Sequence, residues 1–194
     1  MAIKTFTSGE VLTASDTNTY LANSGLTYIT SASITTASAS ISVSNCFTSE
    51  YHNYRIVIDS INLSPNPCNL FMRMRDSGGD YTAAFQYYAY SGFKANGTTF
   101  DTANTLQTLM YLGVVSTFND KMASLSLDLY NPQTASIRTY GTLNVMGYDG
   151  NFYGRQGMIC ADNTSQFTGF SLLTDVAGTP IDGLQVKVYG YRKP

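Results

Sequence analysis

The residues that could do chemistry in this chain are few, and they form no catalytic or metal-binding set. The single histidine, His52, lies in a polar stretch, residues 49–53, just before a run typical of a strand. Nucleophilic catalysis needs a histidine beside a nucleophile and an orienting group, whereas a lone histidine in a turn is typical of a solvated residue. Residues 76–80 (DSGGD) offer either clustered oxygens for calcium or a plain turn, and they lack the ligand series of an EF-hand. We predict no catalytic histidine, no bound metal and no cofactor.

The carboxylates also argue against hydrolysis of a polysaccharide. That reaction needs a carboxylic acid and a second carboxylate facing each other across a cleft. The chain has only two glutamates, Glu10 and Glu50, and Glu10 lies in the N-terminal segment. Asp59 and Asp128 lie in strand-like runs, but alternation places Asp128 opposite a face of leucines, toward solvent or a neighbouring subunit. We therefore predict that the protein is not an enzyme.

The three cysteines, Cys46, Cys68 and Cys160, are an odd number and cannot all pair in intrachain disulfides. Together with one histidine they also lack the spacing of zinc ligands. Cys46 and Cys160 lie in apolar runs, where a free thiol behaves as a small hydrophobic side chain. We predict that both are buried and reduced.

Tyrosine is unusually frequent, with 15 tyrosines and no tryptophan. Its flat apolar ring and hydrogen-bonding tip suit strand packing, subunit interfaces and sugar binding alike. Core packing, an interface and an exposed ligand surface therefore all stay open for these residues. The candidate ligand loops are rich in Tyr, Gly and Asn and cover residues 77–81, 91–100 and 148–153. Within these loops the candidate ligand residues are Tyr81, Phe93, Tyr148 and Tyr153.

The composition is that of a β-rich globular protein. With 43% hydrophobic and 13% aromatic residues the chain can form a core, and its 194 residues fit one domain plus a short arm. A net charge of −2 and a pI of 5.2 argue against a nucleic-acid partner. No apolar run approaches the roughly 18 residues of a membrane span, and the N-terminus lacks the apolar segment of a secretory signal. We predict no nucleic-acid binding, no membrane insertion and synthesis in the cytoplasm.

Behind residue 25 the chain becomes a series of short runs with the period of two that indicates β-strands. In the clearest run, 124–129, Leu125, Leu127 and Leu129 must all point to one side. The turn signal Asn96-Gly97 fits a tight hairpin with positive φ at both central residues. About eleven strands with short turns predict an all-β fold, a β-sandwich of jelly-roll type. The predicted strands cover residues 26–30, 39–43, 54–61, 70–75, 85–91, 105–115, 124–129, 143–145, 156–161, 170–172 and 184–188.

The first 25 residues differ from the rest of the chain. Thr13 and Asp16 have the three-residue spacing of a capping box, and the sequence ending at Gly25 is typical of a helix terminus. So short a helix with so few apolar residues cannot be stable alone in water, and it must dock onto another surface. We predict an N-terminal anchoring arm, 1–25, with one short helix, followed by a β-sandwich domain, 26–194.

The N-terminal segment 6–21, FTSGEVLTASDTNTYL, resembles the start of structural proteins of tailed bacteriophages, whose pattern is T-x-G-E-V-L-T-A-x-D-x-N-x-Y-L. The closing segment 184–194, LQVKVYGYRKP, is similar to the ending of small virion proteins common in marine phage genomes. The two matches cover 16 and 11 of the 194 residues. Thr17 stands where that pattern often has an apolar residue. The positions that fit the arm pattern are Gly9, Glu10, Val11, Leu12, Thr13, Ala14, Asp16, Asn18, Tyr20 and Leu21.

The resemblance implies a non-enzymatic virion component whose arm attaches to the particle and whose β-domain projects outward. We expect a homotrimer, assembled in the host cytoplasm and exposed on the particle surface, with other virion proteins as partners of the arm. A charged fraction of only 12% fits subunits that pack side by side. Adhesion to a host-surface glycan or protein, as in a short tail fibre, and a role as a head fibre or capsid-decorating protein both fit. A carbohydrate-binding module or depolymerase is the third alternative, and it lacks the carboxylate pair.

Overall fold

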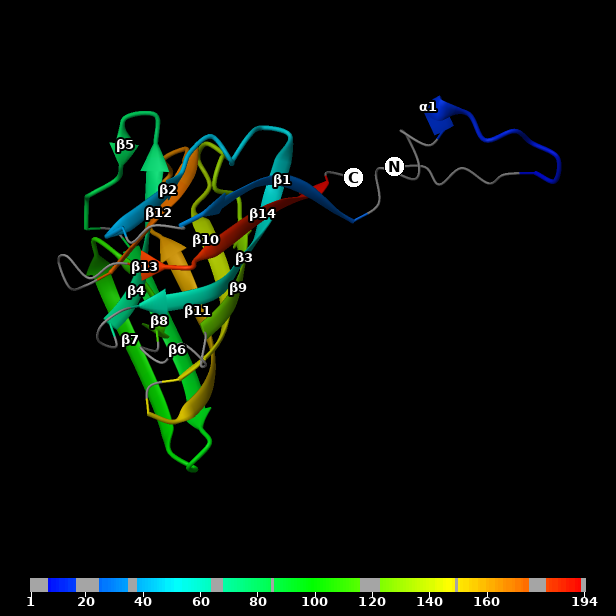
Figure 1. Ribbon diagram of the computed structural model, residues 1–194. Coiled ribbons are helices and arrows are strands. Elements are labelled where there is room, and N and C mark those ends of the chain that lie inside the picture. Colours follow the sequence, from blue (N-terminus) through cyan, green and yellow to red (C-terminus); the bar gives the residue numbers. More distant parts are fainter. Residues whose placement is uncertain are drawn as a thin grey trace.

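The protein is built from two antiparallel β-sheets packed face to face. The computed structural model describes residues 7–16, 25–34, 38–63, 68–84, 86–115, 123–148, 150–174 and 181–192. Within these ranges a three-residue helix, α1 (Ala14–Asp16), lies outside the sandwich (Figure 1). The prediction of an all-β sandwich is confirmed. The jelly-roll topology and the division into arm and body stay predictions.

The larger sheet has nine strands, in the order β1-β14-β3-β9-β10-β11-β6-β7, with β13 paired to β3 beside this path. The successive strands β9, β10 and β11 form a meander in its middle, and β1 and β14 pair at one edge. Its members are β1 (Leu26–Ser33), β3 (Tyr51–Leu63), β6 (Gln86–Lys94), β7 (Thr99–Gln107), β9 (Ala123–Tyr130), β10 (Thr139–Tyr148), β11 (Phe152–Ala161), β13 (Ile181–Asp182) and β14 (Gln185–Arg192).

The smaller sheet has five strands, in the order β2-β12-β4-β5, with β8 also paired to β4 along the edge away from β12. It covers one face of the larger sheet, which we call the inner face. The opposite face of the larger sheet is called the outer face below. The members of the smaller sheet are β2 (Ser40–Val43), β4 (Cys68–Asp76), β5 (Gly79–Asp80), β8 (Met110–Val115) and β12 (Gly169–Thr174).

The period of two in β9 and β10 decides which residues enter the core. Both strands alternate between buried and more exposed positions along their whole length. Leu125, Leu127 and Leu129 are buried on the inner face, and the register places Leu143 and Val145 beside them on β10. The smaller sheet contributes Leu70, Met72, Met74, Phe170 and Leu172, all of them buried. Since burying apolar area contributes roughly 25 cal/mol per Å², this shared layer holds the two sheets together.

The prediction of a single strand over residues 105–115 is wrong. The strand β7 ends at Gln107 and β8 begins at Met110, and these two strands belong to different sheets. The chain crosses at Thr108, whose carbonyl oxygen accepts hydrogen bonds from Gln86 Nε2 (2.6 Å) and Arg73 Nε (3.4 Å). Both donors are distant in sequence, so local periodicity carries no sign of this break.

The hairpin between β6 and β7 is present, but its predicted backbone geometry is wrong. The loop contains three residues, because Lys94 N donates to Thr98 O (2.8 Å) and Gly97 N donates to Lys94 O (3.0 Å). Gly97 has a φ of 87°, whereas Asn96 is not among the residues with positive φ. A three-residue loop places one residue in the left-handed region, where a two-residue type I′ turn needs two. Asn96 instead caps the loop, since its Oδ1 accepts a hydrogen bond from Thr98 N (3.1 Å).

Candidate functional site

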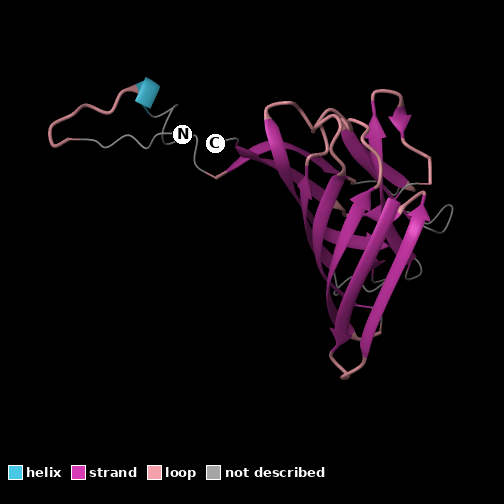
Figure 2. Ribbon diagram, turned by 180° about the vertical axis from the view of Figure 1, so that it is seen from behind, coloured by secondary structure: helices cyan, strands magenta, loops and turns pink. Residues whose placement is uncertain are grey.

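Two of the three candidate ligand loops lie together at one end of the sandwich. The register pairs Lys94 with Tyr153, and Ala95 N donates to Phe152 O (2.7 Å), so the β6–β7 and β10–β11 hairpins run side by side to their tips. Figure 2 shows these tips at the end of the molecule opposite the β4–β5 loop. Loops 91–100 and 148–153 therefore share one end, and loop 77–81 lies at the other.

The four candidate ligand residues have different surroundings. Phe93 is 67% exposed, so a ligand on the surface can contact it. Tyr148 is half-buried and packs edge-on against Phe152, with ring centroids 5.1 Å apart. Tyr153 is only 5% exposed and points into the sandwich, so a ligand on the surface cannot contact it. Tyr81 packs edge-on against the buried ring of Phe167 (5.8 Å), which makes it a core-packing residue at the opposite end.

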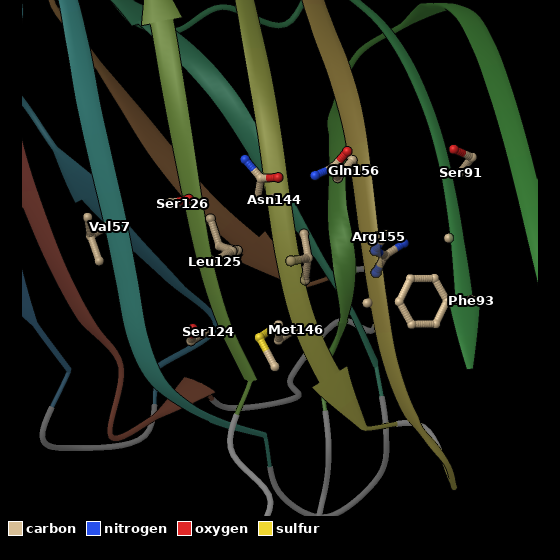
Figure 3. Close-up of a pocket in the computed structure, with 13 residues that line it drawn as sticks. Val57, Ser91, Phe93, Ser124, Leu125, Ser126, Asn144, Met146, Arg155 and Gln156 are labelled. Carbon is tan, nitrogen blue, oxygen red and sulfur yellow. The ribbon is translucent and has the colours of Figure 1, made fainter. Parts of the chain in front are cut away.

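A shallow trough of ≈ 600 Å³ lies on the outer face of the larger sheet (Figure 3). Its floor follows a row of cross-strand neighbours, Val57, Ser126, Asn144, Gln156 and Ser91. These side chains are small or uncharged, so they leave the sheet surface open between taller neighbours. The trough can therefore bind by hydrogen bonds and apolar contact, and it offers no acid or base for catalysis.

A ridge of apolar side chains borders this trough. Met146 and Phe93 lie on either side of Gly154 in the next row of the sheet. The ring of Phe93 lies beside that glycine, since a Cβ there would be 3.7 Å from Phe93 Cζ. Phe152 extends the ridge toward the hairpin tips and is itself exposed. An exposed apolar ridge beside an uncharged trough is typical of a surface that binds a partner.

The charged side chains in the middle of the outer face pair with one another. Arg55 and Asp128 are 3.7 Å apart, and Tyr191 donates to Asp128 (2.7 Å). Lys187 and Asp59 are 3.8 Å apart. The Tyr191 hydrogen bond and the Asp128 charge raise the pKa of Arg55, while burial and the Asp128 hydrogen bond raise the pKa of Tyr191. Asp59 and Asp128, the two carboxylates that the sequence predicted in strands, are thus held in ion pairs rather than across a cleft.

The inner face contains a buried cation that the sequence gives no reason to expect. The guanidinium of Arg155 lies over the rings of Tyr90 (4.7 Å), Tyr111 (4.7 Å) and Tyr153 (5.0 Å). Among the described residues no carboxylate forms an ion pair with it, and the Nε atom has no hydrogen-bond partner there. A Cβ on Gly113 would come within 2.5 Å of Arg155 Nη2, so that glycine leaves the space the guanidinium occupies.

The cluster of Arg155 and its three tyrosines alters the pKa of its members. Burial raises the pKa of Tyr111 to about 12, although the neighbouring guanidinium opposes this effect. Burial of Arg155 lowers its pKa, but the phenols of Tyr153 and Tyr111 raise it by more. Arg155 therefore stays charged and Tyr111 stays neutral. Cation–π contact is a structural use of this cation, and the cluster has no exposed reactive group.

The segment 76–80 forms a turn whose carboxylates bind protein groups. Asp76 Oδ1 accepts a hydrogen bond from Gly78 N (2.7 Å). Asp80 contacts Arg75, lies 3.7 Å from Arg73, and accepts a hydrogen bond from Ser171 (2.7 Å). Two arginines beside one carboxylate repel a cation, which disfavours calcium here. No three His, Cys, Asp or Glu side chains gather into a possible metal site anywhere in the described part of the chain.

The other residues considered for chemistry are dispersed. His52 is exposed in β3, where its carbonyl accepts a hydrogen bond from Asn131 N (2.8 Å). Cys46 is fully buried, as predicted, and burial raises its pKa to about 12. Cys160 is only half-buried, because it lies on the outer face, and burial also raises its pKa. The side chain of Cys68 lies outside the described residues.

The N-terminal segment has the predicted capping box. Thr13 Oγ1 accepts a hydrogen bond from Asp16 N (3.1 Å), and Thr13 N donates to Asp16 Oδ2 (3.1 Å). A second turn of the same kind joins Thr7 N to Glu10 Oε2 (3.1 Å). The anchoring positions Gly9, Glu10, Val11, Leu12 and Thr13 are all exposed, with Val11 at 78%. Asn18, Tyr20 and Leu21 lie outside the described residues, and so do Asn23 and Ser24 of the predicted helix terminus.

The described residues include no helix long and apolar enough to cross a membrane. No protein-family model matches the chain, and no curated protein and no solved structure is detectably similar to it.

Proposed function

We propose that this protein is a non-enzymatic structural component of a tailed-phage virion, a homotrimeric, fibre-like appendage that adheres to the host surface. Its N-terminal arm attaches to the particle, and its sandwich, of jelly-roll type, faces outward. The resemblance of residues 6–21 to the arm of phage structural proteins is the observation that carries this proposal. Its partners are other copies of the chain, other virion proteins, and a glycan or protein of the host surface.

The exposed N-terminal segment supports the attachment role. Residues 7–15 are exposed along their whole length, and they include the apolar side chains of Val11 and Leu12. Two side-chain-capped turns, at Thr7 and Thr13, preform the segment before it meets a partner. A preformed segment loses less conformational entropy on docking, which favours attachment.

The distal hairpins support the adhesive role. The tips of the β6–β7 and β10–β11 hairpins lie far from β1, the strand that follows the arm (Figure 1). Residues 95–98 at the tip of the β6–β7 hairpin are exposed. An anchor at one end and exposed loops at the other fit a protein that bridges a particle and a surface.

Removing the arm tests the attachment role. A variant that lacks residues 1–24 should keep the thermal transition of the full chain, because the arm contributes no residue to the described core. The same variant should be missing from purified particles, as measured by mass spectrometry of gradient-banded virions. A truncated protein that still incorporates into particles would contradict the anchoring role. Loss of the thermal transition would show that the arm is part of the core.

Deleting the gene separates adhesion from capsid decoration, the alternative that the same arm pattern supports. Particles without an adhesin should adsorb poorly to host cells, and added soluble protein should compete with intact particles. Particles without a decorating protein should adsorb normally, and they should bind added protein back. The experiment measures free phage against time after mixing with host cells. Normal adsorption by the deletion particles would reject adhesion and favour decoration.

A further inference from the structure

The exposed apolar side chains of the body gather on a single surface. Eight large hydrophobic side chains are exposed between residues 25 and 192 among those described. Seven of them lie on the outer face of the larger sheet, and the eighth, Ile137, lies in the β9–β10 connection. Scattered exposed hydrophobic residues are ordinary, whereas five of these seven lie together on the three adjacent strands β10, β11 and β6. The seven are Leu26, Tyr28, Phe93, Tyr140, Met146, Phe152 and Met158.

We infer that this outer face is the surface through which copies of the chain associate, so that its occupant is a second copy of this protein. The inference deepens the proposed function, since it rests on the homo-oligomer proposed there and names its interface.

Charge is the first argument for a second copy as the occupant. The ion pairs Arg55–Asp128 and Lys187–Asp59 neutralise the charged residues of the central strands within one face. A face with a net charge would repel its own copy, whereas a face whose charges are paired internally meets its copy without repulsion. Among the described residues that point outward from the strands of the larger sheet, the remaining charged residue is Asp101. It lies on β7, at the edge of the sheet.

Shape is the second argument. The ridge of Met146 and Phe93 stands beside the trough floored by Ser126, Asn144 and Gln156 on the same face. The same surface therefore offers both a projection and a space to receive one. A contact about a two-fold axis needs such self-complementarity, because each copy contributes the same residues, whereas around a three-fold axis the ridge of one copy can enter the trough of the next.

Area is the third argument. With about 4.8 Å between strands and 3.4 Å per residue along them, the eight strands in the main path of the larger sheet over the length of Tyr140 to Tyr148 span roughly 900 Å². A stable protein–protein interface buries about 800 Å² on each partner. The face is thus large enough to hold copies together without any other contact. A neutral oligosaccharide in the trough would leave Tyr28 and Tyr140 uncovered.

The mass of the full chain in solution tests the inference. Sedimentation equilibrium of the wild-type protein should give a multiple of the 21.1 kDa monomer mass. Met146→Glu should shift the protein to monomer, because a carboxylate would be buried without a partner at the centre of the contact. Ile137→Glu is the matched control, since it makes the same change at an exposed position off the face, and it should leave the mass unchanged. Near-UV circular dichroism reports whether each variant is folded, and Met158→Glu replaces Met146→Glu if that variant is not.

The outcomes separate this inference from the proposed function. A dimer that Met146→Glu dissociates supports the interface and contradicts only the trimer of the proposed function. An oligomer that both Met146→Glu and Met158→Glu leave intact overturns the interface, whatever the protein does on particles. A wild-type protein that is monomeric also overturns it. If the methyl NMR signal of Met146 in that monomer shifts on titration with a neutral oligosaccharide, the face binds glycan instead.

Discussion

The two faces of the larger sheet are made by the same strands but follow different chemistry. On β10 the buried positions Leu143 and Val145 alternate with the exposed positions Asn144 and Met146. The inner face is covered by the smaller sheet along these strands, and its apolar residues belong to one cluster. The outer face is formed by the same strands, and on it exposed apolar side chains stand among polar and charged ones. The inner face is thus filled by the core of the fold, whereas the outer face leaves its side chains open to contact.

The faces also treat charge differently. The inner face buries one guanidinium, Arg155, among tyrosine rings and away from any described carboxylate. The outer face keeps its cations half-exposed and beside carboxylates, as in Arg55–Asp128. An exposed pair contributes little to stability but keeps the surface neutral. Charge on the inner face is thus stacked on aromatic rings, whereas charge on the outer face is neutralised by a neighbouring carboxylate.

The largest difference between the faces is expected from neighbouring residues on β9. Leu127 is fully buried on the inner face, so Leu127→Ala should lower the free energy of unfolding by about 2–5 kcal/mol. Ser126 points to the outer face, and Ser126→Ala should change it by only about 0.5 kcal/mol. Urea unfolding of both variants at equal concentration measures the two values. Equal losses of unfolding free energy in the two variants would mean that both faces of β9 are buried, which would contradict the difference between the inner and outer faces.

Alkaline pH should lower the free energy of unfolding, because it favours ionisation of a thiol that is buried in the core. The folded pKa of Cys46 is about 12, above its ordinary value of 9.0, because the thiol is buried. The folded state therefore holds this proton more tightly, and the resulting stability is complete below pH 9 and is lost as the pH rises toward 12. Each pH unit in this window corresponds to about 1.4 kcal/mol.

Cys46→Ala isolates this effect from the buried phenols Tyr54 and Tyr111, whose pKa values are also raised. The unfolding free energies of wild type and variant, measured by urea titration from pH 8 to 11, should converge as the wild type loses its thiol contribution. Cys160→Ala, on the more exposed outer face, serves as the control and should converge less. If the unfolding free energies of Cys46→Ala and wild type kept a constant difference across this pH range, the pH dependence could not be assigned to the Cys46 thiol.

The stacked cation on the inner face should be sensitive to shape at constant charge. Arg155→Lys replaces a planar guanidinium by a compact ammonium that cannot lie flat on the rings of Tyr90 and Tyr111. We expect a loss of about 1–2 kcal/mol in unfolding free energy, the scale of a desolvated cation–π contact. Arg192→Lys, at an exposed position in β14, is the matched control and should change little. If Arg155→Lys left the unfolding free energy unchanged, only the charge at this position would matter.

The sequence predicts the inner face well because its information is local. A strict period of two in residues 124–129 is enough to place Leu125, Leu127 and Leu129 on one side of a strand, and the structure confirms this. The break within 105–115 could not be predicted, because the side chains that hydrogen-bond to Thr108 O at this point, Gln86 and Arg73, come from elsewhere in the chain. The same holds for the Arg155 cluster, whose three tyrosines come from β6, β8 and β11.

The candidate site was harder to predict for a related reason. Ser126, Asn144 and Gln156 are ordinary residues for a solvated strand face, and only the register joins them into one row. Met146 and Met158 are the residues that could have indicated this site in the sequence, since each is a large apolar residue at an outward position of its strand. The candidate ligand residue Tyr153 has the opposite parity to the exposed Phe152, so alternation alone separates a buried from an exposed aromatic residue there.

The smallest effect is expected from a conservative change on the outer face, and it should depend on protein concentration. Met146 is 71% exposed in the single chain, so Met146→Ser removes few contacts and should change the unfolding free energy by about 0.5 kcal/mol or less in dilute solution. If copies associate through this face, the wild-type melting temperature must rise with concentration, because association stabilises only the folded state. Met146→Ser should weaken that rise, whereas Leu127→Ala should lower the melting temperature at every concentration and keep the rise. Differential scanning fluorimetry over a hundredfold concentration range measures both slopes. A concentration-independent wild type would leave the inner face as described and remove the reason for treating the outer face as an interface.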